Sequence, residues 1–379
     1  MNALPRPDMT QGSEPGPVPR VIAFHLPQFH RIPENDAWWG EGFTEWTNVR
    51  KARPLYASHR QPSVPLAGNY YDLTNPATRD WQAKLARQYG VHGFCYYHYW
   101  FNGKRLLERP CDEILASGQP DFPFCFSWAN ESWTRAWDGA QRNVLMQQDY
   151  GDELAWKRHF QHLLHYFRDP RYLTHRGKPM FLIYRPGDFP ERNQMMMCWE
   201  RWAQEAGLPG VCFIKTLTCF DAVAEGSPYS AAVSFEPWLT VRRHTSFSHR
   251  AACLLARGIL RTGRFLGVER KFVYSYDRVW RDLLARRHGP DDFPGAFVGW
   301  DNTPRRGWES MIVDGGTPEK FGVYFRQLLQ GAVRDGAPYV FVNAWNEWAE
   351  GAYLEPDERY GYAYLENLKE AIEKELGDG

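Results

Sequence analysis

The stretch "YVFVNAWNEWAEGAYLEPD", residues 339–357, begins as an apolar run and ends in polar and aromatic residues. A short apolar run that leads into a turn is typical of a buried strand. Two carboxylates, Glu347 and Glu350, come where this strand would end. Residues three apart point to opposite sides of a strand but share one face of a helical turn. A turn that begins near Trp348 would therefore direct both carboxylates to one place.

Seven similar apolar and aromatic runs precede this one. They span residues 21–26, 93–100, 123–129, 179–185, 211–216, 231–237 and 296–302, and the eighth is 339–348. Segments of helical character separate several of them, and a last one, "YLENLKEAIEKEL", follows the eighth run. Eight strands that alternate with helices predict a single (β/α)8 barrel. An open doubly wound sheet is the alternative, but no strand candidate is followed by GxGxxG.

The domain organisation follows from the same pattern. Residues 1–19 are rich in Pro, Gly and polar residues and are expected to be a disordered leader, without the apolar core of a signal peptide. Residues 20–379 are expected to form one domain, with long insertions at 27–78 and 238–295. The second insertion carries a basic stretch, residues 241–271, which we expect to form helices over one edge of the active face.

Charge and composition limit the classes of partner. Lys plus Arg and Asp plus Glu both number 45, so no net charge favours nucleic acid. No apolar run is long enough to span a membrane, and a cytoplasmic location is expected. The seven cysteines lack CxxC spacing, and His25 and His30 have no evident third ligand, so neither a metal nor a cofactor is predicted. The 16% aromatic content suits a ligand with flat faces, such as a sugar.

In a barrel of this kind, the side chains that act on a ligand stand at the carboxyl ends of the strands. We call this end of the barrel the mouth. Alternate residues of a strand face opposite ways, so only part of each set is expected to point inward. The candidate substrate-binding residues are His25, Glu45, Trp46, Tyr97, His98, Tyr99, Trp100, Trp128, Asn130, Glu131, Glu236, Trp238, Trp300, Asp301, Asn302, Arg305, Asn346, Trp348 and Tyr353.

Two of these candidates carry alternatives. Glu131 lies among tryptophans, so it either pairs with a cation such as Arg135 or binds sugar hydroxyls. Arg305 stands beside Arg306; such a pair is usually exposed to solvent. If one of them points into the mouth, it would suit a phosphate or an acidic sugar.

Two carboxylates among aromatic rings are suited to glycosidic bond chemistry. One group protonates the leaving oxygen while the other assists at the anomeric carbon. Burial and mutual repulsion would raise one pKa above the other and so separate an acid from a base. Glu347 and Glu350 are therefore the candidate catalytic residues; the alternative is a pair of surface carboxylates.

The segment "WNEWAEGAYLEPD" resembles the Asn-Glu-Trp-His-Glu-Gly segment, with a following Glu-Pro, of glycoside hydrolase family 99, the endo-α-mannosidases. The chain resembles still more the WbsX-type proteins, found with genes for O-antigen and capsule synthesis. The motifs are "FHLPQFHRIPENDAWWGEGFTEWTNVRKARPLY", "GFCYYHYWFNGKRLLERP", "FSWANESWTRAWDG", "GWDNTPRR" and "AWNEWAEGAYLEPD", and they cover roughly residues 20–365.

This resemblance implies a retaining, metal-independent mechanism. The glutamate that corresponds to Glu347 would act as a base on the sugar's 2-hydroxyl, which attacks its own anomeric carbon and forms a 1,2-anhydro sugar. The glutamate that corresponds to Glu350 would protonate the leaving oxygen and then deprotonate the incoming hydroxyl. The family histidine between the two is Ala349 here, which puts the substrate and the hydrolytic outcome in doubt.

Three functions are compatible with the sequence. The first is a retaining glycoside hydrolase or transglycosylase that acts on α-linked, mannose-type or related glycans. The second is a WbsX-type glycosyltransferase in polysaccharide assembly, with a nucleotide- or lipid-linked sugar as donor, although no DxD motif in a clear setting or Gly-rich nucleotide loop supports it. The third is a non-catalytic glycan-binding barrel.

Overall fold

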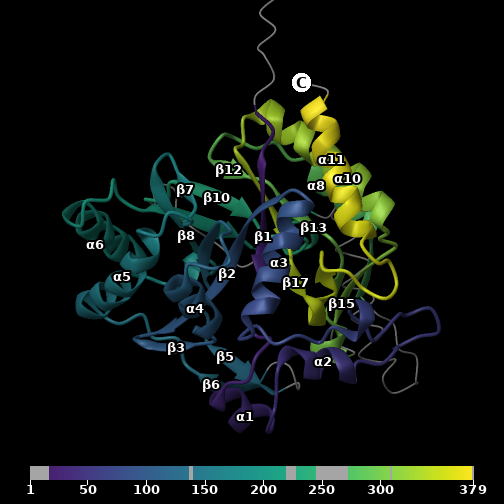
Figure 1. Ribbon diagram of the computed structural model, residues 1–379, viewed down its shortest axis with the longest axis horizontal. Coiled ribbons are helices and arrows are strands. Elements are labelled where there is room, and N and C mark those ends of the chain that lie inside the picture. Colours follow the sequence, from purple (N-terminus) through teal and green to yellow (C-terminus); the bar gives the residue numbers. More distant parts are fainter. Residues whose placement is uncertain (1–16, 136–139, 219–227, 245–271, 308–309, 378–379) are drawn as a thin grey trace, which may run out of the picture.

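The computed structural model describes residues 17–135, 140–218, 228–244, 272–307 and 310–377. Its centre is a nearly closed barrel of parallel strands (Figure 1), in the order β12, β10, β9, β8, β4, β2, β1, β16 and β13. These strands are β1 (Arg20–His25), β2 (Val91–Phe101), β4 (Phe124–Trp128), β8 (Lys178–Ile183), β9 (Cys212–Leu217), β10 (Ala231–Ser234), β12 (Asp292–Phe293), β13 (Gly295–Phe297) and β16 (Tyr339–Asn343).

One position of the barrel is shared by β12 and β13. β12 pairs with β10 and β13 pairs with β16, both in parallel. Between them lies Pro294, which has no N–H to donate to a ladder, although its carbonyl accepts from Phe341 N at 2.9 Å. The eight apolar runs of the sequence therefore fill eight barrel positions, as predicted, and the fold is a (β/α)8 barrel.

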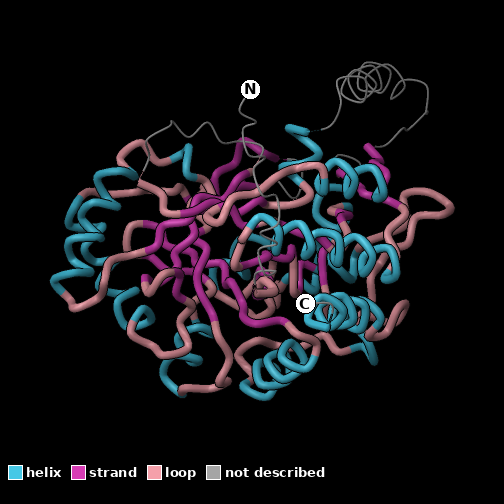
Figure 2. Tube along the Cα trace, turned by 90° about the horizontal axis from the view of Figure 1, so that it is seen from above, coloured by secondary structure: helices cyan, strands magenta, loops and turns pink. Residues whose placement is uncertain are grey.

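Helices surround the strands (Figure 2). They are α1 (Pro33–Trp39), α2 (Glu45–Lys51), α3 (Pro76–Gln88), α4 (Arg109–Ser117), α5 (Glu153–Phe167), α6 (Arg192–Glu205), α8 (Tyr276–Leu284), α9 (Thr303–Arg306), α10 (Pro318–Asp335) and α11 (Ala363–Gly377). The bounds of α10 show why such segments begin and end where they do. Thr317 caps the first turn through Lys320 N, and Gly336 follows the helix at φ 72°, a left-handed conformation that glycine adopts without strain.

Short strands and turns lie outside the barrel strands. They are β3 (Lys104–Leu106), β5 (Trp133–Arg135), β6 (Ala140–Met146), β7 (Thr174–His175), β11 (Phe272–Ser275), β14 (Trp300–Asp301), β15 (Met311–Asp314), β17 (Asn346–Glu347), β18 (Ala352–Tyr353), the 3₁₀ turns Leu66–Gly68, Pro186–Asp188 and Trp348–Glu350, and the π-helical turn Thr240–His244. Figure 1 shows α1, α2, β5 and β6 at the same end of the molecule. These elements follow β1 and β4 in the chain, so this end is the mouth.

Aromatic side chains fill the barrel interior. Phe24 of β1 is fully buried and its ring lies 5.3–5.9 Å from those of Tyr97, Phe235 and Phe341, which come from three other strands or strand ends. Their packing fixes which alternate residues of β2 face inward: Tyr97 and, by alternation, Tyr99. The interior below the mouth is therefore a packed core.

Parts of two predictions fall outside the described residues. The expected leader, residues 1–19, is described only from residue 17, and the basic stretch 241–271 only as far as residue 244. Of the helices described, none is both long and apolar enough to cross a membrane.

Candidate active site

The chain leaves β16 across the end of β1. Trp345 N donates to Phe24 O at 2.8 Å. The side chain of Asn346 then binds the backbone of Leu26 twice, accepting from its N–H at 2.7 Å and donating to its carbonyl at 3.0 Å. Because a side-chain amide offers a donor and an acceptor, it continues the pairing that the backbone no longer makes. Asn346 thus holds the next residues over the mouth.

The two candidate glutamates lie on the turn that follows. Trp348–Glu350 form a single 3₁₀ turn, in which residues three apart lie on one side, as the sequence predicts. Gly351 ends the turn at φ 62°, and a Cβ there would lie 2.9 Å from the backbone nitrogen of Asp301. Glycine adopts this positive φ without strain, and its lack of a Cβ leaves room for the backbone of Asp301. The turn can therefore pack tightly against β14.

Arg305 joins both glutamates. It lies on α9 and is 9% exposed. Its Nη2 donates to Glu347 Oε2 at 3.0 Å and its Nη1 to Glu350 Oε1 at 2.7 Å. The planar guanidinium presents its donors at fixed angles, so it also fixes the two carboxylates relative to each other.

A third carboxylate binds the same arginine. Glu45 begins α2, is fully buried, and accepts from Arg305 Nε at 2.9 Å and from Asn48 at 3.2 Å. Its second oxygen, Oε2, is buried without a hydrogen-bond partner among the described residues. We call Glu45, Arg305, Glu347 and Glu350 the carboxylate cluster. Three carboxylates share one guanidinium, so full ionisation would leave two uncompensated negative charges.

This imbalance changes the acidity of both candidate glutamates. Burial, together with the neighbouring carboxylates, raises the pKa of Glu347 to about 8, against the opposing effect of Arg305. Burial likewise raises the pKa of Glu350, whose side chain is one-fifth exposed. At neutral pH the cluster therefore retains a proton, as acid catalysis requires.

Tyrosines and an ion pair lie close to the cluster. Glu347 and Glu350 contribute, after burial, to raising the pKa values of Tyr97 and Tyr184, and Glu347 does so for Tyr99. All three phenols therefore stay protonated and can donate hydrogen bonds. Glu131 accepts from Arg185 Nε and Nη2 at 3.0 and 2.8 Å, so it pairs with a cation, and its side chain remains 42% exposed.

Trp348 is held on the far side of the turn. Its Nε1 donates to Glu355 at 2.6 Å, and its ring stacks on Tyr353 at 3.9 Å and contacts Trp46 at 5.5 Å. Trp46 is itself fixed by a hydrogen bond from Nε1 to Tyr71 O at 2.8 Å. Trp46, Trp348 and Tyr353 are thus packing residues that support the glutamates.

Several residues considered for substrate contact point away from the cluster. His98 and Trp100 lie on the outer face of β2, where His98 Nε2 is 2.9 Å from His159 Nε2 of α5 and Trp100 stacks on His159. His25 binds Gln82 of α3, and burial lowers its pKa to about 3. We therefore assign these side chains to packing. The reason is the alternation of each strand, which places them opposite the inward residues.

Two more candidates brace strand ends. Asn130 pairs with the backbone of Arg185 through both amide atoms, at 2.7 and 2.9 Å, and so ties the end of β4 to that of β8. Trp128 is 1% exposed and donates to Trp100 O at 3.2 Å. Neither side chain has a free face toward a ligand, and we assign both to structure.

The remaining candidates make hydrogen bonds, ion pairs or ring contacts with residues outside the carboxylate cluster. Glu236 is fully buried and paired with Arg286, which follows the end of α8. Trp238 and Trp300 pack edge to face at 5.6 Å, and the side chain of Asn302 accepts from Met311 N. Asp301 binds His59 and Gln61, which help to lower its pKa, and lines a separate cavity of about 570 Å³.

Tyr184 and Arg185 are functional candidates that the sequence reasoning missed. Both end the fourth apolar run, "PMFLIYR", so the rule that strand ends face the mouth would have found them. The sequence suggests Arg305 as a ligand for phosphate or an acidic sugar. In the structure its guanidinium donates hydrogen bonds to three carboxylates. Among the described residues, no group of three or more His, Cys, Asp or Glu is arranged to hold a metal ion.

The (β/α)8 barrel is a fold that this chain shares with solved glycoside hydrolase-like proteins. Comparison with solved structures agrees. A structure titled "Glycoside hydrolase-like protein" matches with a TM-score of 0.56 at 14% identity, covering 95% of this chain and 97% of that one. The family 99 endo-α-mannosidase of Bacteroides thetaiotaomicron matches with a TM-score of 0.52 at 13% identity, covering 94% and 98%. At such identities the likeness concerns the fold.

Comparison of sequences gives the family. The model of the WbsX glycosyltransferase family matches residues 21–368, and the chain belongs to this family of carbohydrate-active proteins. The protein WxcX of Xanthomonas campestris pv. campestris strain B100 is 38% identical over 360 residues. That match covers 93% of this chain and 49% of WxcX, so the chain spans about half the length of this relative.

Proposed function

We propose that this chain is a retaining carbohydrate-active enzyme that cleaves α-linked glycans, of mannose type or related, and passes the sugar to water or to another hydroxyl. One observation carries the proposal: Glu347 and Glu350 lie on one turn at the carboxyl end of β16, both bound by Arg305. The family and the fold support carbohydrate chemistry in general.

The chemistry proceeds in two steps. Glu347 takes the proton from the sugar's 2-hydroxyl, the oxygen attacks the anomeric carbon, and the bond to the leaving oxygen breaks as Glu350 protonates it. Water or an acceptor hydroxyl then attacks the anomeric carbon, giving its proton to Glu350, while Glu347 returns its proton to the 2-oxygen. Neither carboxylate bonds to carbon, so the separation expected for a nucleophilic glutamate is not required.

The first step needs the cluster's proton on Glu350 and an ionised Glu347. Burial raises the pKa values of both glutamates. A bound 2-hydroxyl would donate to Glu347 and favour its ionised form, and a sugar that covers Glu350 would remove its remaining solvent. Substrate binding is therefore expected to place the proton on Glu350.

Transfer from an activated sugar is the second candidate, because the family is named for glycosyl transfer. The charge of the cluster disfavours a phosphate at Arg305. Three carboxylates surround that guanidinium, and a phosphate would meet their repulsion at short range. We therefore favour an uncharged leaving group at the cluster, with transfer arising when a sugar hydroxyl replaces water.

The test is product analysis by mass spectrometry. Wild type, Glu350→Gln and the exposed control Glu366→Gln are incubated in ¹⁸O-water with α-linked mannose-containing and bacterial glycans, with and without acceptor sugars. We expect shortened, ¹⁸O-labelled glycans or lengthened acceptors from wild type and from the control, and a loss of about 10²–10⁴-fold in Glu350→Gln. Equal turnover by Glu350→Gln would refute the proposal.

If wild type alters no glycan in that pool, the result contradicts the hypothesis that the chain is a glycoside hydrolase or transglycosylase. The same three proteins are then assayed with nucleotide- and lipid-linked sugars. Transfer that Glu350→Gln abolishes would establish the second candidate at the same site.

A further inference from the structure

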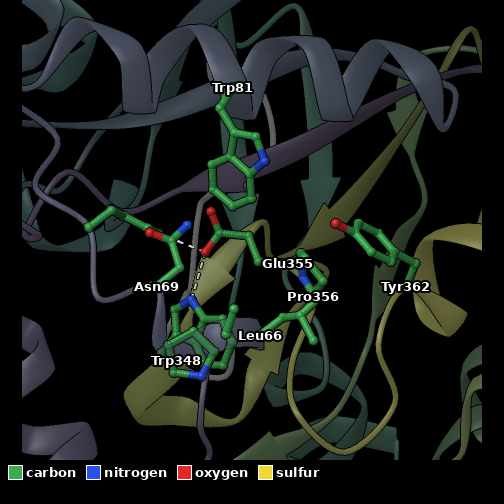
Figure 3. A pocket seen from close by; sticks show the side chains of 10 residues that line it. Leu66, Asn69, Trp81, Trp348, Glu355, Pro356 and Tyr362 are labelled. Atoms are coloured by element: carbon green, nitrogen blue, oxygen red, sulfur yellow. Dashed lines mark hydrogen bonds between the residues drawn. The ribbon is translucent and has the colours of Figure 1, made fainter.

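A second pocket lies behind the turn that carries the catalytic candidates. It is a cavity of about 260 Å³ between the segment 65–69, helix α3 and the segment that follows Trp348. Figure 3 shows its wall of aromatic rings around one carboxylate. It is lined by Pro65, Leu66, Ala67, Asn69, Tyr71, Trp81, Trp348, Glu355, Pro356 and Tyr362. We call it the Glu355 pocket.

Glu355 is held in place by three donors. Tyr71 Oη and Trp348 Nε1 donate to its Oε2 at 2.8 and 2.6 Å, and Gln82 Nε2 donates to its Oε1 at 2.7 Å. Glu355 is 3% exposed, and burial raises its pKa to about 7, against the effect of its hydrogen bonds and of the nearby Trp345 indole. The Trp345 Nε1 has no hydrogen-bond partner by distance and angle among the described residues, so Gln82 is the one donor to Oε1 there. A carboxylate oxygen accepts about two hydrogen bonds, so Oε1 can accept a further one.

Aromatic rings of two kinds surround this carboxylate. Tyr71 and Trp348 are buried and form the floor, whereas Trp81 is partly buried and Tyr362 is 37% exposed. In Figure 3 the rings of Trp81 and Tyr362 lie on different sides of Glu355, with Asn69 opposite Tyr362. Ring faces beside a carboxylate and an exposed amide match a ligand with apolar faces and a hydroxylated edge.

We propose that the Glu355 pocket binds a single uncharged pyranose unit of a glycan, outside the carboxylate cluster. The volume is below the roughly 300–1,000 Å³ of sites for drug-sized ligands, so it suits one ring. A sugar hydroxyl would donate to Glu355 Oε1, and the sugar's C–H face would stack on Trp81 or Tyr362.

Other ligand classes fit this pocket less well. A phosphate or uronate would meet the charge of Glu355, and none of the described residues that line the pocket is Arg or Lys. A purely apolar ligand would cover Glu355 without using its remaining acceptor site, which costs free energy. A neutral ring with hydroxyl groups satisfies both conditions.

The pocket also adjoins the candidate active site. Trp348, which stands between Glu347 and Glu350 in the sequence, forms part of the pocket floor and donates to Glu355. A sugar bound here would lie behind the catalytic turn, where it could retain one part of a glycan while another part occupies the mouth.

The test measures binding without turnover. The full chain carrying Glu347→Gln is titrated with the methyl α-pyranosides of mannose, glucose and galactose, and with methyl glucuronide, by saturation-transfer difference NMR. Trp81→Ala and Leu66→Trp are added separately; the second fills the pocket from a partly exposed loop without removing packing. Tyr324→Ala on α10, which does not line the pocket, is the control.

We expect saturable binding of at least one neutral glycoside with a Kd of about 1 mM, weakened tenfold or more by Trp81→Ala and by Leu66→Trp and unchanged by Tyr324→Ala. Binding of no glycoside, or binding that both pocket variants leave unchanged, overturns the proposal. Tighter binding of the glucuronide would contradict the neutral class. Because turnover is not measured, the result is independent of whether the carboxylate cluster proves catalytic.

Discussion

Glu347 and Glu355 lie on the same short segment and are both buried, yet they are stabilised in different ways. Glu347 shares one guanidinium with two other carboxylates, whereas Glu355 receives three hydrogen bonds from neutral donors. Burial raises both pKa values, to about 8 and about 7. The first arrangement is short of positive charge, and the second is nearly satisfied.

The difference separates a reactive site from a supporting one. A cluster with three carboxylates and one guanidinium keeps a proton that it can give to a substrate. Glu355 is surrounded by neutral donors. One of them is Trp348, and the hydrogen bond from its indole to Glu355 fixes its ring behind the turn. Changes to the two regions should therefore affect different quantities: mainly activity for the carboxylate cluster and mainly stability for Glu355.

The largest effect is expected at Arg305. Arg305→Met removes the group that fixes Glu347 and Glu350 relative to each other, and kcat should fall by about 10²-fold or more, with a smaller change in KM. Arg305→Lys keeps the charge but not the planar fork and should restore only part of kcat. Steady-state kinetics of both variants would check this, and full activity of Arg305→Met would exclude a positioning role.

The pH dependence of activity is expected to follow the cluster's proton. Its loss near pH 8 removes the acid, so kcat/KM should fall about tenfold per pH unit above that value. Arg305 opposes the rise in the pKa of Glu347, so Arg305→Lys should leave this limb closer to its wild-type position than Arg305→Met, which should move it to higher pH. A rate that is flat to pH 10 would show that no cluster proton takes part.

Glu355→Gln should destabilise the fold. The amide replaces one acceptor by a donor, which then faces Gln82 or the pair Tyr71 and Trp348. A buried mismatch of this kind costs about 1–3 kcal/mol in the free energy of unfolding. Urea unfolding at pH 5 would measure it, because at higher pH the ionisation of Glu355, whose pKa is raised, lowers the stability of wild type itself. A variant as stable as wild type at pH 5 would mean that the three hydrogen bonds contribute little.

Glu347→Gln should change the free energy of unfolding in the opposite direction, toward higher stability as the pH rises. Between the ordinary carboxyl pKa and about 8, native Glu347 holds a proton that the unfolded chain releases, so wild-type stability falls as pH rises through this window. The amide does not titrate and can still accept from Arg305. With a pKa raised from 4.5 to about 8, the variant's stability advantage should grow by about 3–4 kcal/mol from pH 5 to pH 8. Melting curves at both pH values test this, with Glu366→Gln as the control.

The sequence predicted the barrel and the carboxylate pair because both depend on local patterns. Apolar runs indicate strands, and the spacing of Glu347 and Glu350 indicates one turn. The partners of that pair could not be predicted in the same way, since Glu45 and Arg305 lie 260 residues apart and meet only in the folded barrel. Nor could the inward face of β2, because aromatic residues occupy both faces, and only packing against Phe24 and α5 selects Tyr97 over His98.

The proposed mechanism requires the carboxylate cluster to hold a proton at neutral pH, since without it no group of the cluster could protonate a leaving oxygen. The direct measurement is a titration of the Glu347 carboxyl by ¹³C NMR in protein labelled at the glutamate side chains, assigned by comparison with Glu347→Gln. We expect a midpoint near pH 8 for Glu347 that rises in Arg305→Met, while the midpoint of Glu355 stays near 7. A Glu347 midpoint near 4.5, its ordinary value, would contradict it.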